Sequence, residues 1–276
     1  MPNAYLAMSR CIMPLAAALL LSACSSATPP SAASAPDAAR AELAPTGKLR
    51  TAINFGNPIL AVRDAATGEP RGVSVDLSRE LARRLGVPVE FVTYTAAGKV
   101  VEGIKSGVWD IAFFAIDPVR AADTDFSAPY VVIEGAYLVP QASSIRRNED
   151  VDREGVRVVV GRGSAYDLFL TRELKKARLL RAATSQAVTD MMLAEKIEVA
   201  AGVKQQLQAD AKRVPGLRLL DGRFMAINQA MAIPKGRPLG TAYVTGFIEE
   251  MKATGFVADA LKRHGIEGAV VAPAAP

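Results

Sequence analysis

A carboxylate and a guanidinium stand just beyond an apolar run in the middle of the chain. The run from Trp109 to Ala115 is nearly all apolar, which is typical of a strand buried on both faces. Asp117 and Arg120 follow it. In open α/β sheets, ligands bind beyond the carboxyl ends of the strands, where a guanidinium can hold a carboxylate through two parallel hydrogen bonds. The spacing leaves two interpretations of Arg120 open: a carboxylate-binding group, or a surface residue of a loop.

A glycine-rich turn later in the chain could meet an anion by another means. Gly161-Arg162-Gly163 leads into Ser164, and Asp167 follows at the spacing of a Ser-x-x-Asp helix start. The first N–H groups of a helix lack intrahelical acceptors and carry partial positive charge, so they suit an anion. Ser164 has a competing duty as the N-cap of that helix.

The elements that must position these groups alternate along the chain. Strands are expected at 48–54, 89–94 and 109–115 with helices between them, which predicts an α/β fold with a parallel sheet and right-handed crossovers. After an extended run at 131–140 the alternation restarts, and a second extended segment at 231–233 could return the chain to the first domain. The chain has 276 residues, half of them hydrophobic, and is long enough for two domains.

The N-terminus is typical of an export signal. Arg10 precedes the apolar run from Cys11 to Leu21, which is too short for a stable membrane span. The run ends in Leu21-Ser22-Ala23-Cys24, which resembles the lipobox of bacterial lipoproteins and implies lipidation of Cys24. The alternative is ordinary cleavage after a later small residue such as Ala35. We expect a signal peptide at 1–24, a flexible tether at 25–46 rich in Ser, Ala and Pro, and a periplasmic lipoprotein anchored to the inner or the outer membrane.

Composition argues against several other classes of function. If Cys11 leaves with the signal and Cys24 carries lipid, the mature domain has no cysteine, and the only histidine, His264, is expected at the surface. We therefore expect no metal site and no cofactor. The net charge of +5 comes from scattered basic residues without interleaved aromatics, so no nucleic-acid partner is expected.

Five motifs in a fixed order carry a family resemblance. They are Gly72–Leu77, Lys105–Asp110, Asp125–Tyr130, Gly161–Ser164 and Met251–Phe256. Over about residues 47–267 the chain resembles the family 3 solute-binding proteins of bacterial amino-acid ABC importers. This resemblance implies a two-lobed periplasmic binding protein fold of type II, with two hinge strands and the ligand in the interlobe cleft. It implies lobe 1 at 47–138, lobe 2 at 139–228, a return to lobe 1 with the C-terminal helices at 229–268, and a tail at 269–276.

The resemblance also implies a ligand site. In the family, an Arg after the third strand of the first lobe pairs with the α-carboxylate of the ligand, and Arg120 stands at the matching place. A helix start in the second lobe presents backbone N–H groups to the same carboxylate, and the loop after the first strand packs on the ligand side chain. The implied contacts are Arg120, Gly163, Ser164, Ala165, Asn54, Phe55 and Asn57.

The sequence departs from the family pattern at two places. The segment from Asp110 to Arg120 is about two residues shorter than usual and lacks the usual Gly and Thr, with Asp117 near the Thr position. In the second lobe, Lys204 lies where an Asp usually binds the ligand ammonium. Either Asp117 has taken over the ammonium, or the ligand has no amine and Lys204 meets a second acidic group. Each also has an ordinary interpretation: Asp117 forms a turn before Pro118, and Lys204 is a solvated lysine.

Three functions compete at this point. The first is capture of a small polar carboxylate-bearing metabolite, most simply an amino acid, for an ABC permease in the inner membrane; we expect this protein to be a monomer and not an enzyme. The second is an enzyme, because relatives of this fold include periplasmic dehydratases that act on cyclohexadienyl acids. Such an enzyme needs an acid or base in the cleft, for which only Asp117 and Lys204 are candidates. The third is a sensory protein that presents its ligand to a receptor.

Overall fold

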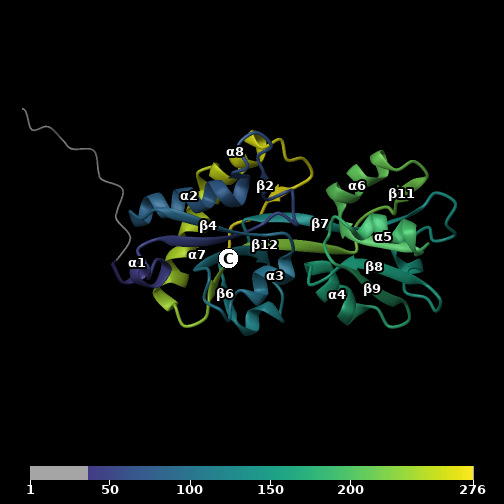
Figure 1. The fold of residues 1–276 in the computed structure, drawn as a ribbon, viewed down its shortest axis with the longest axis horizontal. Helices are drawn as coiled ribbons and strands as arrows, with labels where there is room; N and C mark the ends of the chain where they lie inside the picture. Colours follow the sequence, from purple (N-terminus) through teal and green to yellow (C-terminus); the bar gives the residue numbers. More distant parts are fainter. Residues whose placement is uncertain (1–36, 276) are drawn as a thin grey trace, which may run out of the picture. The chain divides into compact units, whose positions relative to one another are not determined.

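A computed structural model of the protein describes residues 37–275 (Figure 1). The predicted signal peptide, Cys24 and the first part of the predicted tether lie outside the described residues. The strands are β1 Leu49–Asn54, β2 Val62–Arg63, β3 Pro70–Arg71, β4 Val89–Tyr94, β5 Ile111–Ala115, β6 Thr124–Phe126, β7 Val131–Pro140, β8 Arg157–Gly161, β9 Arg178–Ala182, β10 Val199–Val203, β11 Leu217–Leu219, β12 Met225–Pro234 and β13 Val270–Val271. The helices are α1 Asp37–Leu43, α2 Val73–Leu85, α3 Ala97–Glu102, α4 Ala165–Glu173, α5 Val188–Ala194, α6 Lys204–Arg213, α7 Pro238–Ala253 and α8 Phe256–Arg263, with short 3-10 turns η1 Arg120–Ala122 and η2 Asn148–Asp150.

Two groups of strands form two α/β lobes. In lobe 1, β1 pairs in parallel with both β4 and β5, and α1, α2, α3, α7 and α8 belong to this lobe (Figure 1). In lobe 2, β8 pairs in parallel with β9 and with β10, and α4, α5 and α6 belong to it. The alternation of strands and helices in the sequence is therefore confirmed as a two-lobed α/β fold, with parallel pairing inside each lobe.

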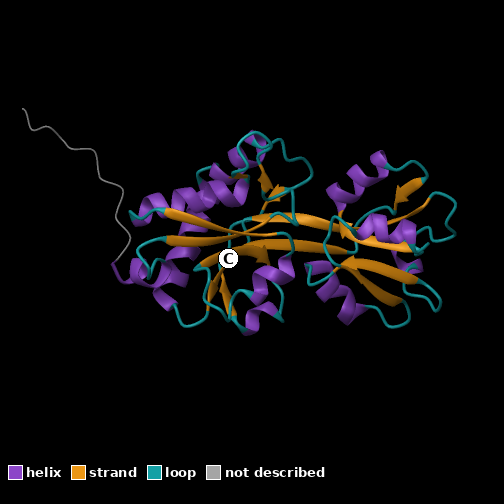
Figure 2. Cartoon of the chain, viewed as in Figure 1, coloured by secondary structure: helices purple, strands orange, loops and turns teal. Residues whose placement is uncertain are grey.

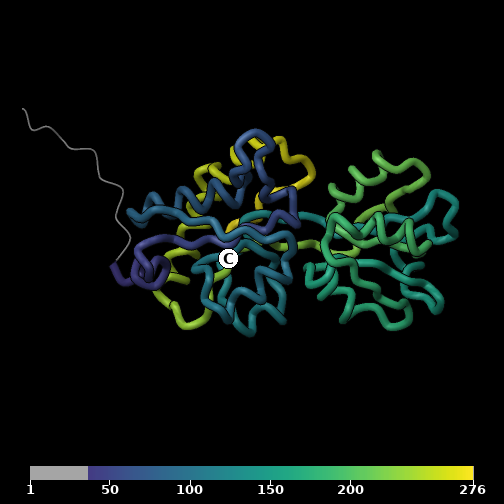
Figure 3. The backbone as a smooth tube through the Cα atoms, viewed as in Figure 1, coloured from purple at the N-terminus to yellow at the C-terminus, as the bar shows by residue number. Residues whose placement is uncertain are grey.

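Two long antiparallel strands connect the lobes. The first half of β7 pairs with β12 and β13, and its second half pairs with β10 and β11 in lobe 2. The strand β12 pairs with β7 over Met225–Gln229 and with β5 over Gln229–Ala232. Figure 2 shows both as the long strands of the molecule, and Figure 3 follows the chain from lobe 1 through β7 and back through β12. Both lobes belong to one compact unit of the described chain.

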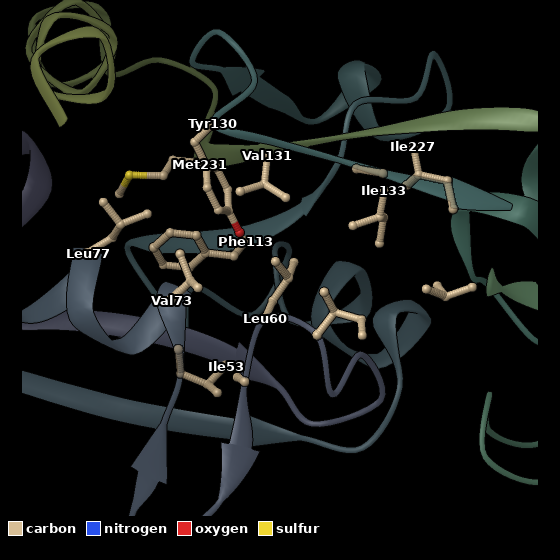
Figure 4. Packing of buried hydrophobic residues seen from close by; sticks show 14 of the residues in the cluster. Ile53, Leu60, Val73, Leu77, Phe113, Tyr130, Val131, Ile133, Ile227 and Met231 are labelled. Atoms are coloured by element: carbon tan, nitrogen blue, oxygen red, sulfur yellow. The ribbon is translucent and has the colours of Figure 1, made fainter. Parts of the chain in front are cut away.

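Local sequence explains the helix that covers the sheet of lobe 1. Leu77, Leu81 and Leu85 recur every fourth residue and are all buried, so α2 presents one apolar stripe to the sheet. The helix ends at Gly86, whose φ of 66° is the left-handed conformation that a residue without a Cβ adopts most readily. Figure 4 shows Leu77 beside the buried side chains that β5, β7 and β12 contribute.

The core of lobe 1 also fixes the strand that precedes Arg120. Every residue of β5 is buried, as expected for a central strand. Phe113 on one face meets Tyr130 edge to face at 5.8 Å between ring centroids, and Phe114 on the other meets Trp109 at 6.4 Å. The Trp109 indole donates to the Val100 carbonyl at 3.0 Å. Packing on both faces therefore fixes the end of β5, from which the chain runs to Arg120.

Segments near both ends of the described chain pack against elements distant in the sequence. Residues 37–43 of the predicted tether form α1, where Leu43 is fully buried against Gly240 of α7. Within the predicted tail, β13 pairs with β7 and Ala272 is buried. The prediction of a flexible tether does not hold for residues 37–43, because composition does not reveal apolar contacts with elements distant in the sequence.

A search of the described residues for helices long and apolar enough to cross a membrane finds none.

Candidate functional site

A cavity of about 40 Å³ lies between the lobes, beyond the end of β5. It is lined from lobe 1, from lobe 2 and from the hinge strand β12. The lining residues are Asn54, Gly56, Asn57, Leu60, Ser74, Ala97, Phe113, Phe114, Ala115, Arg120, Ser164, Ala165, Tyr166, Ser185, Val203, Ile227 and Gln229. Of the predicted site residues, the structure therefore brings together Arg120, Ser164, Ala165, Asn54 and Asn57.

Arg120 is the buried cation of this pocket. Its residue surface is only 2% exposed. The guanidinium donates from Nη1 to the Ala115 carbonyl and from Nη2 to the Gly163 carbonyl, each at 2.9 Å, and it lies 5.2 Å from the centroid of the Phe114 ring. Its Nε is buried and has no hydrogen-bond partner among the described residues. The Nε–H is thus unpaired, and each Nη has bonded only one of its two N–H groups, so donors remain for a group that enters the pocket.

The charge on Arg120 is not balanced by an ion pair. Burial lowers the pKa of Arg120 to about 10, and the nearby charge of Asp117 only partly opposes this shift. Within the described chain no carboxylate lies within 4.0 Å of the guanidinium, because Asp117 pairs with Arg172 instead. A buried charge without a partner is strongly unfavourable, so an anionic ligand would find a site prepared for it.

The helix start in lobe 2 is built as a cap, as its sequence predicts. The Asp167 N–H donates to Ser164 Oγ at 3.0 Å, which confirms Ser164 as the N-cap of α4. The Gly163 N–H donates to Asp167 Oδ2 at 2.8 Å and the Ser164 N–H to the Gly161 carbonyl at 3.1 Å. Two of the three N–H groups predicted to meet a ligand, those of Gly163 and Ser164, are therefore occupied, and Gly163 offers its carbonyl to Arg120. The donors that remain at this helix start are the N–H groups of Ala165 and Tyr166.

Residues of the loop after β1 contact two places: the asparagines line the pocket, and Phe55 contacts lobe 2. Asn54 Oδ1 accepts the Gly56 N–H at 2.8 Å, whereas Asn57 Oδ1 is buried and has no partner among the described residues. Phe55 does not line the pocket: its ring lies 4.8 Å from the Arg63 guanidinium carbon, and its carbonyl accepts from Gln186 Nε2 at 2.9 Å. The two asparagines, and not the aromatic ring, face the cavity.

The structure does not place Asp117 or Lys204 in the pocket lining. Asp117 Oδ2 accepts from Arg172 Nη2 at 2.9 Å across the cleft, and its Oδ1 accepts the Val119 N–H at 2.9 Å. Lys204 Nζ donates to Glu134 Oε2 on β7 at 2.8 Å. Neither predicted alternative, an ammonium on Asp117 or a second acid on Lys204, agrees with these positions. The oppositely charged partners that hold them away are remote in sequence, so local spacing could not reveal them.

The lobes meet directly around the cavity. Besides the bonds from Arg120 to Gly163 and from Arg172 to Asp117, Gln186 of lobe 2 bonds the loop after β1. A Cβ built on Gly163 would lie 2.7 Å from the Cα of Gly98 in α3. The two backbones therefore leave no room for a side chain here, as expected of a closed arrangement of the lobes.

Sequence reasoning missed several lining residues. Gln229 is a buried polar residue of β12 that directly precedes the apolar, buried stretch from Ala230 to Ile233, a pattern that could have indicated a site. Tyr166 donates its hydroxyl to Ser185 Oγ at 2.7 Å, and burial raises the pKa of this hydroxyl. No local motif marks Ser185, which reaches the pocket only because β9 and α5 bring it there.

Comparison with known proteins places this geometry among binding proteins. Residues 49–266 match the model of a family described as bacterial extracellular solute-binding proteins, family 3. A search of curated protein sequences gives no significant match.

Among solved structures, a mutant of ArgBP from T. maritima is similar at a TM-score of 0.71 and 20% identity, covering 83% of this chain and 100% of that one. The solute receptor for L-cysteine of Neisseria gonorrhoeae is similar at a TM-score of 0.71 and 26% identity, covering 84% and 94%. The ancestral amino acid-binding protein AncCDT-1, a precursor of cyclohexadienyl dehydratase, is similar at a TM-score of 0.68 and 24% identity, covering 81% and 98%.

Proposed function

Since the chain belongs to the bacterial extracellular solute-binding proteins of family 3, we propose that it captures a small carboxylate-bearing solute between its lobes and delivers it to an ABC permease. The observation that carries this proposal is Arg120, a buried guanidinium whose Nε has no partner and which has no acid within ion-pair distance in the described chain. The proposal also includes a lipid anchor at Cys24 and a periplasmic location. Only the N-terminal sequence supports these two features.

The ligand carboxylate would meet donors from both lobes. Arg120 Nε belongs to lobe 1, and the N–H groups of Ala165 and Tyr166 begin α4 in lobe 2. Charge-assisted hydrogen bonds to a carboxylate are stronger than those between neutral groups, and a helix start favours an anion. A carboxylate that bonds to both lobes at once would stabilise the closed form, which is how binding would be coupled to closure.

Binding is better supported than catalysis. The two residues that the sequence offered as an acid or base for an enzyme, Asp117 and Lys204, are in ion pairs outside the pocket lining. Neighbouring structures are named for arginine and cysteine, which makes amino acids the first ligands to test. Importer and sensor share the same closure, and an operon that encodes a permease and an ATPase would favour the importer.

The ligand itself is the direct test. Purified protein is denatured, and the small molecules that it releases are identified by mass spectrometry and then added back in a thermal-shift assay. A released carboxylic acid that raises the midpoint of unfolding supports the proposal. A neutral or cationic solute in its place would refute the role of Arg120, and conversion of the added acid to a product would indicate an enzyme.

Closure has its own test in two glycines with similar backbones. Gly163 has a φ of +69° and a Cβ there would collide with Gly98 across the cleft, whereas Gly155 has a φ of +83° with nothing within 4 Å. Replacing either by alanine strains the backbone alike. We expect only Gly163→Ala to weaken binding of the released acid; equal affinity in both variants would show that the lobes do not close on the ligand.

A further inference from the structure

The pocket carries a single charge. Of the residues that line it in the described chain, only Arg120 is ionised at neutral pH, and the remaining polar lining groups are amides and hydroxyls. A ligand with one carboxylate brings the sum of charges in the closed pocket to zero. A zwitterion with one carboxylate and one ammonium leaves an unbalanced positive charge beside the buried Arg120, where an unpaired charge is strongly unfavourable.

The acids nearest the pocket are occupied by basic partners. Asp117 pairs with Arg172 at 2.9 Å. Asp167 is 5% exposed; it accepts the Gly163 N–H on one oxygen and Arg181 Nε, at 2.9 Å, on the other. These carboxylates are held outside the lining by contacts that also build the closed cleft and the start of α4. An ammonium in the pocket would therefore have no carboxylate to face.

The neutral oxygens of the pocket do not replace a carboxylate. Asn54 Oδ1 already accepts the Gly56 N–H, and Ser185 Oγ already accepts the Tyr166 hydroxyl. Asn57 Oδ1 is buried without a partner in the described chain, and the Gln229 carboxamide, which also lines the cavity, is a second neutral acceptor. An ammonium brings three donors, whereas a hydroxyl brings one. Neutral amide oxygens satisfy a hydroxyl, whereas they leave the charge of an ammonium unbalanced.

We propose that this pocket selects small carboxylic acids without an amine, with 2-hydroxy acids as the best fit. The carboxylate lies on Arg120 Nε and on the N–H groups of Ala165 and Tyr166, and the hydroxyl donates to Asn57 Oδ1. The cavity of about 40 Å³ sets the size. A single water needs roughly 10 to 15 Å³ measured in this way, so the closed pocket suits acids of about two to four carbons. This inference rests on the proposed capture of a carboxylate and narrows its ligand class.

Matched pairs of acids test the proposal by calorimetry on the full mature protein after exhaustive dialysis. Glycolate is compared with glycine and L-lactate with L-alanine, with propionate as an acid that lacks both groups. We expect each hydroxy acid to bind at least about 100-fold more tightly than its amino acid. Amino acids that bind equally well or better overturn this inference but leave carboxylate capture intact. Failure of every acid in a panel of two to six carbons refutes the proposed function, and this inference with it.

A charge added to the pocket provides a second readout. Asn57→Asp puts a carboxylate at the open acceptor, and we expect it to shift the ratio of amino-acid to hydroxy-acid affinity toward the amino acid by at least about tenfold. Asn228→Asp adds the same charge on β12 at an exposed position outside the pocket lining, so it should leave the ratio unchanged. An unchanged ratio in both variants shows that charge in the pocket does not select the ligand.

Discussion

Replacing Arg120 by methionine should remove ligand affinity without a comparable loss of stability. At neutral pH, the fall of its pKa to about 10 corresponds to roughly 3 kcal/mol of penalty on the buried charged form. Methionine removes this penalty and also the two hydrogen bonds to the Ala115 and Gly163 carbonyls, which contribute about 1.5 kcal/mol each, the lower end of the range for a charged donor. The two effects nearly cancel, so the ligand-free variant should unfold within about 1 kcal/mol of the parent protein.

Arg50 is the matched control because its charge is paired. It bonds the fully buried Asp110 through Nε at 2.9 Å and Nη2 at 2.8 Å. Arg50→Met leaves a buried carboxylate with less compensation, and removing one partner of a buried pair costs about 3 to 5 kcal/mol. Arg237 still donates to Asp110 at 3.1 Å, which places the expected loss at the lower end of that range.

Urea denaturation with and without the released acid measures both quantities. Loss of a buried charged partner costs about 2 to 5 kcal/mol of binding, so Arg120→Met should weaken affinity by about 30-fold to 4,000-fold. Arg50→Met should keep the affinity and lose stability. The pH dependence has a fixed sign: the penalty on Arg120 is present below pH 10 and is relieved only as the pH rises past that value, because the unfolded chain then holds the proton more tightly. Equal destabilisation by both substitutions, or unchanged affinity in Arg120→Met, would refute the reasoning.

Three further substitutions test separate parts of the structure. Ser164→Ala removes the oxygen that caps the Asp167 N–H at 3.0 Å and should lower the free energy of unfolding by about 1 kcal/mol in urea; no loss would mean that the cap is dispensable. Asp117→Asn weakens the pair with Arg172, whose side chain is 39% exposed, so calorimetry should show less than about a fivefold loss of affinity; a 100-fold loss would place Asp117 on the ligand. Cys24→Ser should move the protein to the soluble fraction on cell fractionation, and persistent membrane association would contradict the lipid anchor.

Local pattern was enough to predict the scaffold of the pocket. The apolar run before Arg120 indicated a buried strand, and the Ser-x-x-Asp spacing indicated the helix that Ser164 caps. Both features depend on residues within a few positions of one another, where periodicity and capping chemistry act directly. The same signals could not say which N–H groups remain free, because that depends on the side chain of Asp167 folding back on the Gly163 N–H.

Contacts between residues distant in the sequence determine which charged and polar groups reach the pocket. Asp117 lies beside Arg120 in sequence, yet its charge is taken by Arg172 of the other lobe. Gln229 and Ser185 reach the cavity through the return strand and through lobe 2, which no local motif marks. The sequence shows which charged residues lie close to Arg120 along the chain. Only the folded structure shows which of these charges already have an ion-pair partner.

The unbalanced charge on Arg120 also links ligand binding to closure. The closed form buries the guanidinium under lobe 2, where Gly163 supplies a carbonyl but no anion. We infer that most of the penalty of roughly 3 kcal/mol arises on closure, since an open cleft would hydrate the group. A penalty of that size disfavours the empty closed form by about 100-fold, and a bound carboxylate removes it. Carboxylate affinity and closure then both depend on the charge of Arg120. Arg120→Met should therefore weaken ligand binding and lower the free energy of closing the empty protein.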